Sequence, residues 1–221
     1  MRPRLGALSN FPEAAVNRLP AGPRRKIAAN ITHDKRWEQP TATTERQYTI
    51  EDLERIRDRV CRYDLIRGEL IELPPADGEH GEIAAGIIGR LWSHVSADKL
   101  GRVYTSETGF LLRRNPDVVR APDAAVIRAE RVPERQPGFY EVSPDLVVEV
   151  VSPSDSASYV QSKVLECLNA GVRMVWVVFP EQQTISIYER GGKVRFLSVD
   201  DTLDGDDVLP GFSVPVAQIF E

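Results

Sequence analysis

Two acidic residues of this sequence lie in stretches that are otherwise apolar. Glu149 stands between valine pairs in 147–151, and Asp123 leads into the apolar run 124–127. Burying an unpaired carboxylate costs several kcal/mol, so each acid should be paired, protonated or bound to a cation. Carboxylates on neighbouring strands can converge on an oxygen-preferring ion such as Mg²⁺. A buried ion pair between Glu149 and a basic side chain is the alternative interpretation.

Lys163 supplies a third group for the same chemistry. It lies in a helix expected over 155–170, beside an apolar stripe of Val160, Val164, Cys167 and Leu168. A lysine that borders this stripe should face the sheet, although its stem could also simply cover apolar surface. Two acids and a lysine suit phosphodiester hydrolysis: the acids hold Mg²⁺ or Mn²⁺, the ion activates water, and the lysine stabilises developing charge.

Two further residues are supporting candidates for a catalytic role. Glu69 has the same strand parity as Ile71 and Leu73, which predicts an inward-facing acid that binds a metal or water, or else a paired structural acid. His80 lies in the first turn of a helix expected over 79–96, where the helix dipole disfavours a charged imidazole. It could belong to the site or serve as a capping or packing histidine.

The elements that would position these residues follow from hydrophobic periodicity. A capping box at 49–52 opens a short helix to about residue 58, and alternating apolar residues predict a hairpin over 63–73 that turns at Arg67-Gly68. The other expected elements are a helix at 79–96, strands at 103–104, 108–113, 123–128, 145–151 and 173–179, a helix at 155–170 that ends at Gly171, and a hairpin at 184–198. The strand-helix-strand unit 145–179 implies a crossover between parallel neighbours. The predicted fold is α/β (α+β with a mixed sheet), with helices packed on a central mixed β-sheet.

Composition and charge narrow the class of protein. Of 221 residues, 42% are hydrophobic and 28% charged, which is typical of a globular chain. Two cysteines and three separated histidines exclude a disulfide framework and a thiolate zinc site, so any metal centre must use mainly carboxylates. The longest apolar run is the six residues 174–179, and no apolar segment follows the first arginines. We therefore expect a cytoplasmic protein without a membrane partner.

The charge is divided unevenly along the chain. Residues 1–40 hold eight Lys or Arg against three Asp or Glu, and the rest of the chain holds twenty against thirty. Five prolines and weak periodicity predict a basic, flexible extension over 1–45 and a domain over 46–221. The extension could be a solvated tail or could contact nucleic acid or another partner. An acidic domain lacks the basic excess that is usual for non-specific DNA binding.

Several motifs in one order resemble a known family. They are 64–72 (DLIRGELIE), 107–110 (ETGF), 120–123 (RAPD), 144–155 (PDLVVEVVSPSD), Lys163, 170–172 (AGV), 175–178 (VWVV), 201–203 (DTL) and 209–212 (LPGF). Over residues 48 to 221 the chain looks like the Uma2 family of the PD-(D/E)xK restriction-endonuclease-like superfamily. The resemblance implies a nuclease-like core, metal-dependent DNA cleavage and a homodimer.

One position departs from the usual superfamily motif. That motif places a lysine two residues after the strand acid, where this chain has Val151. Lys163 matches superfamily members in which the following helix carries the lysine. The candidate catalytic residues are therefore Asp123, Glu149, Lys163, Glu69 and His80, with Asp123 and Glu149 as metal ligands. A catalytically silent binding or scaffold protein, and a metal-dependent hydrolase of another substrate, remain the alternatives.

Overall fold

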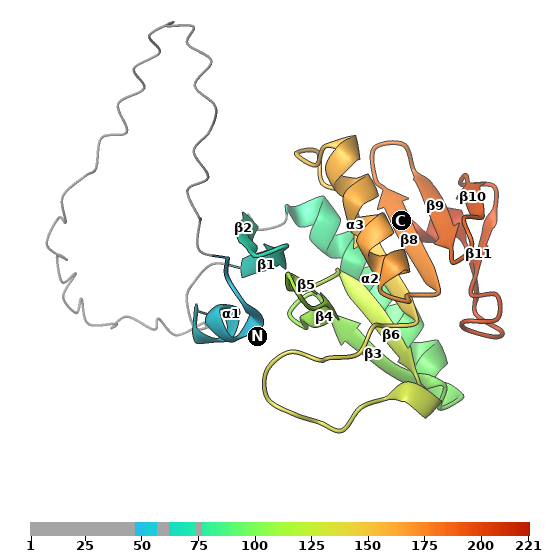
Figure 1. Ribbon diagram of the computed structural model, residues 1–221. Helices are drawn as coiled ribbons and strands as arrows, with labels where there is room; N and C mark the ends of the chain where they lie inside the picture. The colour runs from blue at the N-terminus through green and yellow to red at the C-terminus, as the bar shows by residue number, and fades with distance from the viewer. Residues whose placement is uncertain (1–46, 57–61, 74–76) are drawn as a thin grey trace, which may run out of the picture. The chain divides into compact units, whose positions relative to one another are not determined.

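The computed structural model of the protein describes residues 47–56, 62–73 and 77–221 (Figure 1). The basic extension predicted over 1–45 lies outside these ranges. The described residues form a mixed α/β fold with three α-helices and a central sheet of six strands. None of the described helices is long and apolar enough to cross a lipid bilayer.

The central sheet has the strand order β10-β9-β8-β7-β6-β3. Its strands are β3 (Gly101–Thr105), β6 (Ala124–Arg128), β7 (Leu146–Val150), β8 (Met174–Phe179), β9 (Thr184–Glu189) and β10 (Val194–Leu197). β7 and β8 run parallel, with Val148 opposite Trp176, and the other neighbours are antiparallel. The predicted mixed sheet and the parallel crossover are therefore confirmed.

Helices cover both faces of this sheet because the residues of β7 alternate between two hydrophobic cores. Val148 and Val150 pack in one core with the buried stripe Ile83, Ile87, Leu91 and Val95 of α2 (Gly78–Ala97). Val147 packs in the other with Val164 and Cys167 of α3 (Ala157–Asn169). Both faces of the strand are thus apolar, as its continuous valine run predicts. Glu149 shares the parity of Val147 and points to the α3 side.

A smaller sheet has the order β2-β1-β5-β4 and carries α1 (Ile50–Ile56). Its strands are β1 (Arg62–Ile66), β2 (Glu69–Leu73), β4 (Phe110–Arg113) and β5 (Val118–Arg120). The predicted hairpin turns at Arg67 and Gly68, whose φ values of 53° and 88° are those of a tight turn of left-handed residues. The capping box is confirmed as well: the Thr49 N–H donates to Asp52 Oδ2 at 3.2 Å, and the Asp52 N–H to Thr49 Oγ1 at 3.4 Å. The predicted end of this helix at residue 58 lies outside the described ranges.

The C-terminal part closes the α2 side of the central sheet. A two-stranded sheet pairs β11 (Thr202–Asp204) with β12 (Ser213–Pro215), and a short 3-10 helix, η2 (Val216–Ile219), follows. Another 3-10 turn, η1 (Ala129–Arg131), follows β6. Phe212, Val216 and Ile219 are buried in the α2 core.

Candidate active site

The register of β6 and β7 brings Asp123 and Glu149 together. The β6–β7 pairing ends with Ala124 opposite Val148, so Asp123, directly before β6, lies near Glu149, and both line the same cleft. The Asp123 carboxylate is further fixed by the Val150 N–H, which donates to its Oδ2 at 2.8 Å. Two acids predicted from separate apolar stretches thus meet at one place.

Lys163 reaches these acids from α3. Its Nζ donates to Glu149 Oε2 at 2.8 Å, and the two side chains are only 16% and 8% exposed. The ends of α3 are well defined. The Ser156 hydroxyl accepts from the Tyr159 N–H at 3.2 Å, and Gly171, at φ 98°, follows the last turn. In this structure Glu149 is therefore held in the ion pair that was one of its two interpretations.

Burial and neighbouring charges act on this pair in opposite directions. Burial raises the pKa of Glu149, the Lys163 ammonium opposes that rise, and the nearby Asp123 adds to it. For Lys163, burial disfavours the ammonium, but the Glu149 and Asp64 carboxylates together hold its pKa above the usual value. Lys163 is therefore charged at neutral pH, and its charge is what keeps an ionised Glu149 tolerable in the apolar strand.

His80 joins the site from the start of α2. Its backbone N–H donates to the N-cap Asp77 at 2.9 Å, and its Nε2 lies 3.2 Å from Asp123 Oδ2. The hydrogen bond to Asp123 raises the pKa of His80 despite partial burial. The expected effect of the helix dipole, which disfavours a charged imidazole, therefore does not decide the direction of the His80 pKa shift. A carboxylate in direct contact outweighs the partial charge of the helix end.

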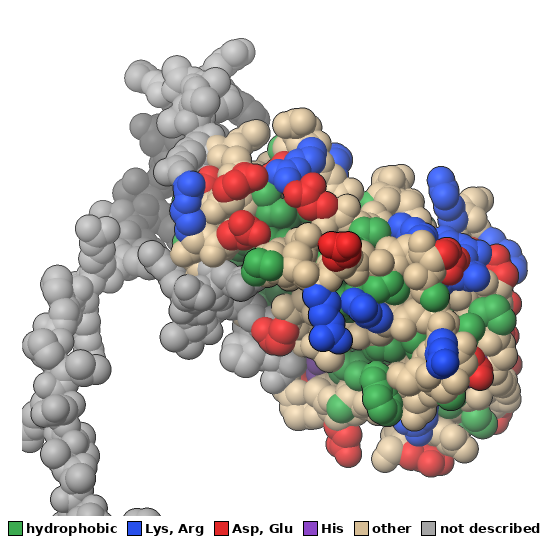
Figure 2. Space-filling model, turned by 90° about the horizontal axis from the view of Figure 1, so that it is seen from below, with side chains coloured by type: hydrophobic (Ala, Val, Ile, Leu, Met, Phe, Trp, Pro, Cys, Tyr) green, Lys and Arg blue, Asp and Glu red, His purple; other side chains and the backbone are tan. Residues whose placement is uncertain are grey.

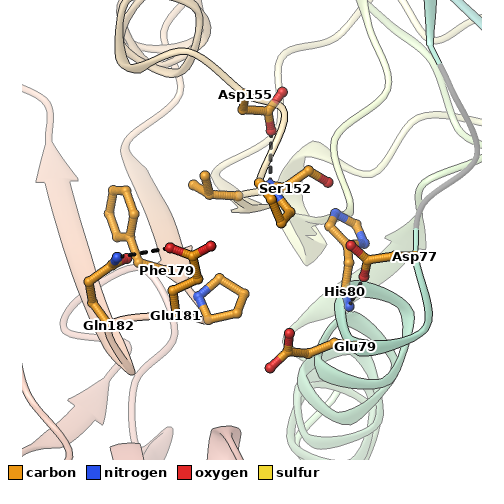
Figure 3. Close-up of a pocket in the computed structure, with 11 residues that line it drawn as sticks. Asp77, Glu79, His80, Ser152, Asp155, Phe179, Glu181 and Gln182 are labelled. Atoms are coloured by element: carbon orange, nitrogen blue, oxygen red, sulfur yellow. Dashed lines mark hydrogen bonds between the residues drawn. The ribbon is translucent and has the colours of Figure 1, made fainter.

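His80, Asp123, Glu149 and Lys163 all line one cleft of about 580 Å³. Its lining consists of Ile71, Glu72, Leu73, Asp77, His80, Ala121, Asp123, Glu149, Val150, Ser152, Pro153, Ser154, Asp155, Tyr159 and Lys163. A second hollow of about 200 Å³ adjoins it (Figure 3) and shares Asp77, His80, Ser152, Pro153 and Asp155. His80 therefore stands at the boundary between the two hollows.

Glu69 does not belong to this group. It shares a face of the hairpin with Ile71, but it lies beside the turn, opposite Ile66, and its side chain is exposed. The expectation of an inward-facing acid at Glu69 is wrong because parity alone does not tell where the covering core ends. The buried acid on this face is Asp64, which is opposite Ile71 and 2% exposed. On β2, the acid that lines the cleft is Glu72.

Sequence reasoning missed a second set of charged residues beside the cleft. Arg120, which is 2% exposed, donates to Asp64 Oδ2 at 2.7 Å and to Glu166 Oε2 at 2.6 Å. The Tyr159 hydroxyl accepts from Arg120 Nη1 at 3.2 Å. An arginine directly after two strand valines was the available signal. Its partners are 56 and 46 residues away, and no local pattern links them.

The side chains that could ligate a metal meet the requirements of a hard cation such as Mg²⁺ only in part. Among the residues that the structure describes, no group of three or more His, Cys, Asp or Glu side chains could hold a metal ion. Asp123 and Glu149 nevertheless offer two carboxylates to an open cleft, and Mg²⁺ is often held by one or two carboxylates, waters and substrate phosphates. The oxygen chemistry of these two residues therefore fits Mg²⁺ or Mn²⁺.

A family model described as "Putative restriction endonuclease", Uma2, matches residues 50–217. The chain belongs to the Uma2 family. A search of curated proteins gives no match. Among solved structures, a crystal structure of "a putative nuclease belonging to DUF820" from Anabaena variabilis ATCC 29413 is similar, with a TM-score of 0.69 and 21% identity. The similarity covers 78% of this chain and 97% of that chain, and it confirms the mixed α/β fold expected for a Uma2 protein.

Proposed function

We propose that this Uma2 protein is an endonuclease that hydrolyses DNA phosphodiester bonds with Mg²⁺ or Mn²⁺. The observation that carries the proposal is the convergence of Asp123, Glu149 and Lys163, from three separate elements, on one open cleft. Burying an acid and a lysine in apolar elements has a cost in stability. A purely structural role would not require both of them to border a cleft that is open to solvent.

Asp123 and Glu149 would hold the ion. When bound there, a divalent cation lowers the pKa of water and polarises a phosphoryl group. Lys163 borders the same cleft, so its ammonium would donate to a phosphate oxygen and stabilise the charge that develops in the transition state. His80 would hold the Asp123 carboxylate in place through its 3.2 Å contact.

A catalytically silent binding protein is the second candidate, and one specific observation favours it. Each candidate metal ligand already has a basic partner, since Lys163 pairs with Glu149 and His80 contacts Asp123. The charge pattern also lacks one feature of many DNA-binding proteins. On the face shown in Figure 2, Lys and Arg side chains are interspersed with acidic ones and form no continuous basic stripe.

Cleavage assays separate the two candidates. Plasmid, single-stranded DNA and RNA are each incubated with the full chain, with and without Mg²⁺ or Mn²⁺. We expect metal-dependent DNA cleavage that falls by about 10²–10³-fold in Glu149→Gln and in Asp123→Asn. Glu82→Gln, which changes an exposed acid of α2, is the matched control and should retain activity. If only RNA is cleaved, the protein is still a phosphodiester hydrolase, but its substrate is RNA and not DNA.

Thermal melts complete the test. If the acids bind the ion, its mass action should raise the melting temperature of the wild type and have much less effect on Glu149→Gln. No response to millimolar Mg²⁺ or Mn²⁺, together with no cleavage, would favour the binding protein. The homodimer implied by the family resemblance stays a prediction that light scattering can test.

A further inference from the structure

A buried arginine lies behind the cleft and is held by two acids. Arg120 of β5 donates to Asp64 of β1 through Nη1 and to Glu166 of α3 through Nε and Nη2, at 2.7, 3.0 and 2.6 Å. Arg120 and Asp64 are each 2% exposed, and Glu166 is 14% exposed. Charge-assisted contacts of this kind fix a guanidinium in a single orientation. The network thus joins the smaller sheet to α3.

Tyr159 links this network to the cleft. Its hydroxyl accepts from Arg120 Nη1 at 3.2 Å and lies 3.4 Å from Asp64 Oδ2. Its ring also lines the cleft. Contacts to Arg120 and Asp64 hold the phenol oxygen in place, so the end of the Tyr159 side chain is anchored beside the cleft.

The ring in turn lies against Lys163. The Lys163 Nζ is 5.2 Å from the centroid of the Tyr159 ring, within the range of a cation–π contact. Tyr159 and Lys163 are four residues apart on α3, so their side chains share one face of the helix. The lysine side chain is a flexible stem of four carbons, and such a stem does not by itself hold the ammonium in one position. Lys163 is therefore bounded by the Glu149 carboxylate on one side and by the Tyr159 ring on another.

We propose that Tyr159, anchored by Arg120 and Asp64, is a positioning residue that fixes the Lys163 ammonium at the cleft. The contribution of this placement to phosphodiester hydrolysis rests on the proposed function. The placement itself does not, because it can be measured in the absence of any substrate.

Lysine NMR tests the placement directly. The chain has five lysines, so protein labelled with ¹³C at lysine Cε should give few signals, and the one missing from Lys163→Arg belongs to Lys163. The Tyr159 ring current should move this signal away from those of exposed lysines. In Tyr159→Leu the displacement should disappear because its source is removed, which shows that the ring lies beside Lys163; the ring-retaining variants described next test whether Lys163 itself moves. Leu165→Ala, at a half-exposed position of the same helix, is the control and should leave the signal in place.

Milder variants test the anchor separately from the ring. Tyr159→Phe keeps the ring and removes the hydroxyl contacts. Arg120→Lys keeps the positive charge but removes the guanidinium that contacts Asp64 and Glu166 at the same time. Both should leave a folded protein in which the Lys163 displacement is reduced but present. A Lys163 signal unchanged in Tyr159→Leu would overturn the proposal. A signal unchanged in both milder variants would overturn the role of Arg120 and Asp64 as the anchor.

Kinetics on plasmid DNA give a second readout. Misplacement of a group that acts in the transition state should lower kcat by about 10–100-fold in Tyr159→Leu, while KM stays near the wild-type value. An unchanged kcat would overturn the positioning role in catalysis. If the wild type itself cleaves nothing, the proposed function fails, and the NMR result still decides the placement of Lys163.

Discussion

The Glu149–Lys163 pair sets the electrostatic character of the cleft. A carboxylate on a strand of the central sheet is stabilised by one ammonium at 2.8 Å, while the nearby Asp123 contributes a second negative charge. Around the cleft and behind it, the contacts join four acids, Asp64, Asp123, Glu149 and Glu166, to three basic residues, His80, Arg120 and Lys163. This set has one acid more than its basic partners, which favours the entry of a cation.

Removal of one partner of the buried pair should destabilise the protein. In metal-free buffer we expect Glu149→Gln to lower the free energy of unfolding by roughly 2–4 kcal/mol, somewhat below the usual cost because Lys163 borders the cleft and can reach water. The double variant Glu149→Gln/Lys163→Met should lose less than the sum of the single losses. Urea unfolding of all four proteins gives the coupling energy. Additive losses would show that the 2.8 Å contact contributes nothing to stability.

The His80–Asp123 contact should make stability depend on pH. Because Asp123 raises the pKa of His80 in the folded protein, the stabilisation is fully present below the unfolded value of about 6.5 and is lost as pH rises through the folded value. In metal-free buffer, His80→Asn should therefore cost more stability at pH 5.5 than at pH 8.5. Urea unfolding across this range measures the difference. In an Asp123→Asn background the pH dependence of the cost should largely vanish, and a cost independent of pH would contradict the assignment.

At the scale of elements, the sequence predicts those helices and strands whose buried residues follow a local hydrophobic pattern. The i, i+4 stripe of α2 and the valine run of β7 bury the residues that their patterns indicate, and the cap at Gly171 lies where expected. β5 was missed because its three residues, 118–120, are too short to show a period. Glu69 was misplaced because its position at the end of the hairpin, and not its parity, decides its exposure.

The features of the candidate site can likewise be separated into those that a local sequence pattern predicts and those that depend on distant contacts. Asp123, Glu149 and Lys163 can be found from the sequence because a charge in an apolar element is a local anomaly. Their common cleft depends on the β6–β7 register, and the partners of Arg120 depend on the packing of the smaller sheet against α3. No short-range pattern in the sequence encodes contacts of this range.

Two glycines in different elements should respond oppositely to alanine. Gly89 lies on the exposed side of α2, and a Cβ there would meet nothing within 4 Å, so Gly89→Ala should stabilise the protein by about 0.5–1 kcal/mol. At Gly101 of β3 a Cβ would overlap the carbonyl oxygen of Ile127. We expect Gly101→Ala to cost about 1–3 kcal/mol or more. Urea unfolding measures both changes. A destabilised Gly89→Ala would show that this face of α2 is covered in the intact protein.

At the scale of the whole molecule, the charge is divided between two parts of the chain. Residues 1–40 carry a basic excess, and the rest of the chain is acidic. The match to the Uma2 family model spans 50–217, so the basic part lies outside the family core. The acidic cleft favours a cation, and a basic segment favours a polyanion such as DNA. We therefore expect activity on DNA to depend on both parts of the chain, and stability to depend on the acidic part alone.

Deletion of residues 1–45 tests this division. The buried apolar residues that the structure describes run from Ile50 to Ile219, and they form three clusters among themselves. Since burial of apolar surface is the main stabilising contribution, the truncated chain should melt within about 2 °C of the full chain. For a domain of this size, 2–4 °C corresponds to about 1 kcal/mol. Calorimetry of the two proteins at equal concentration gives the answer. A fall of about 10 °C would mean that the first 45 residues bury apolar surface against the domain or against a second copy of it.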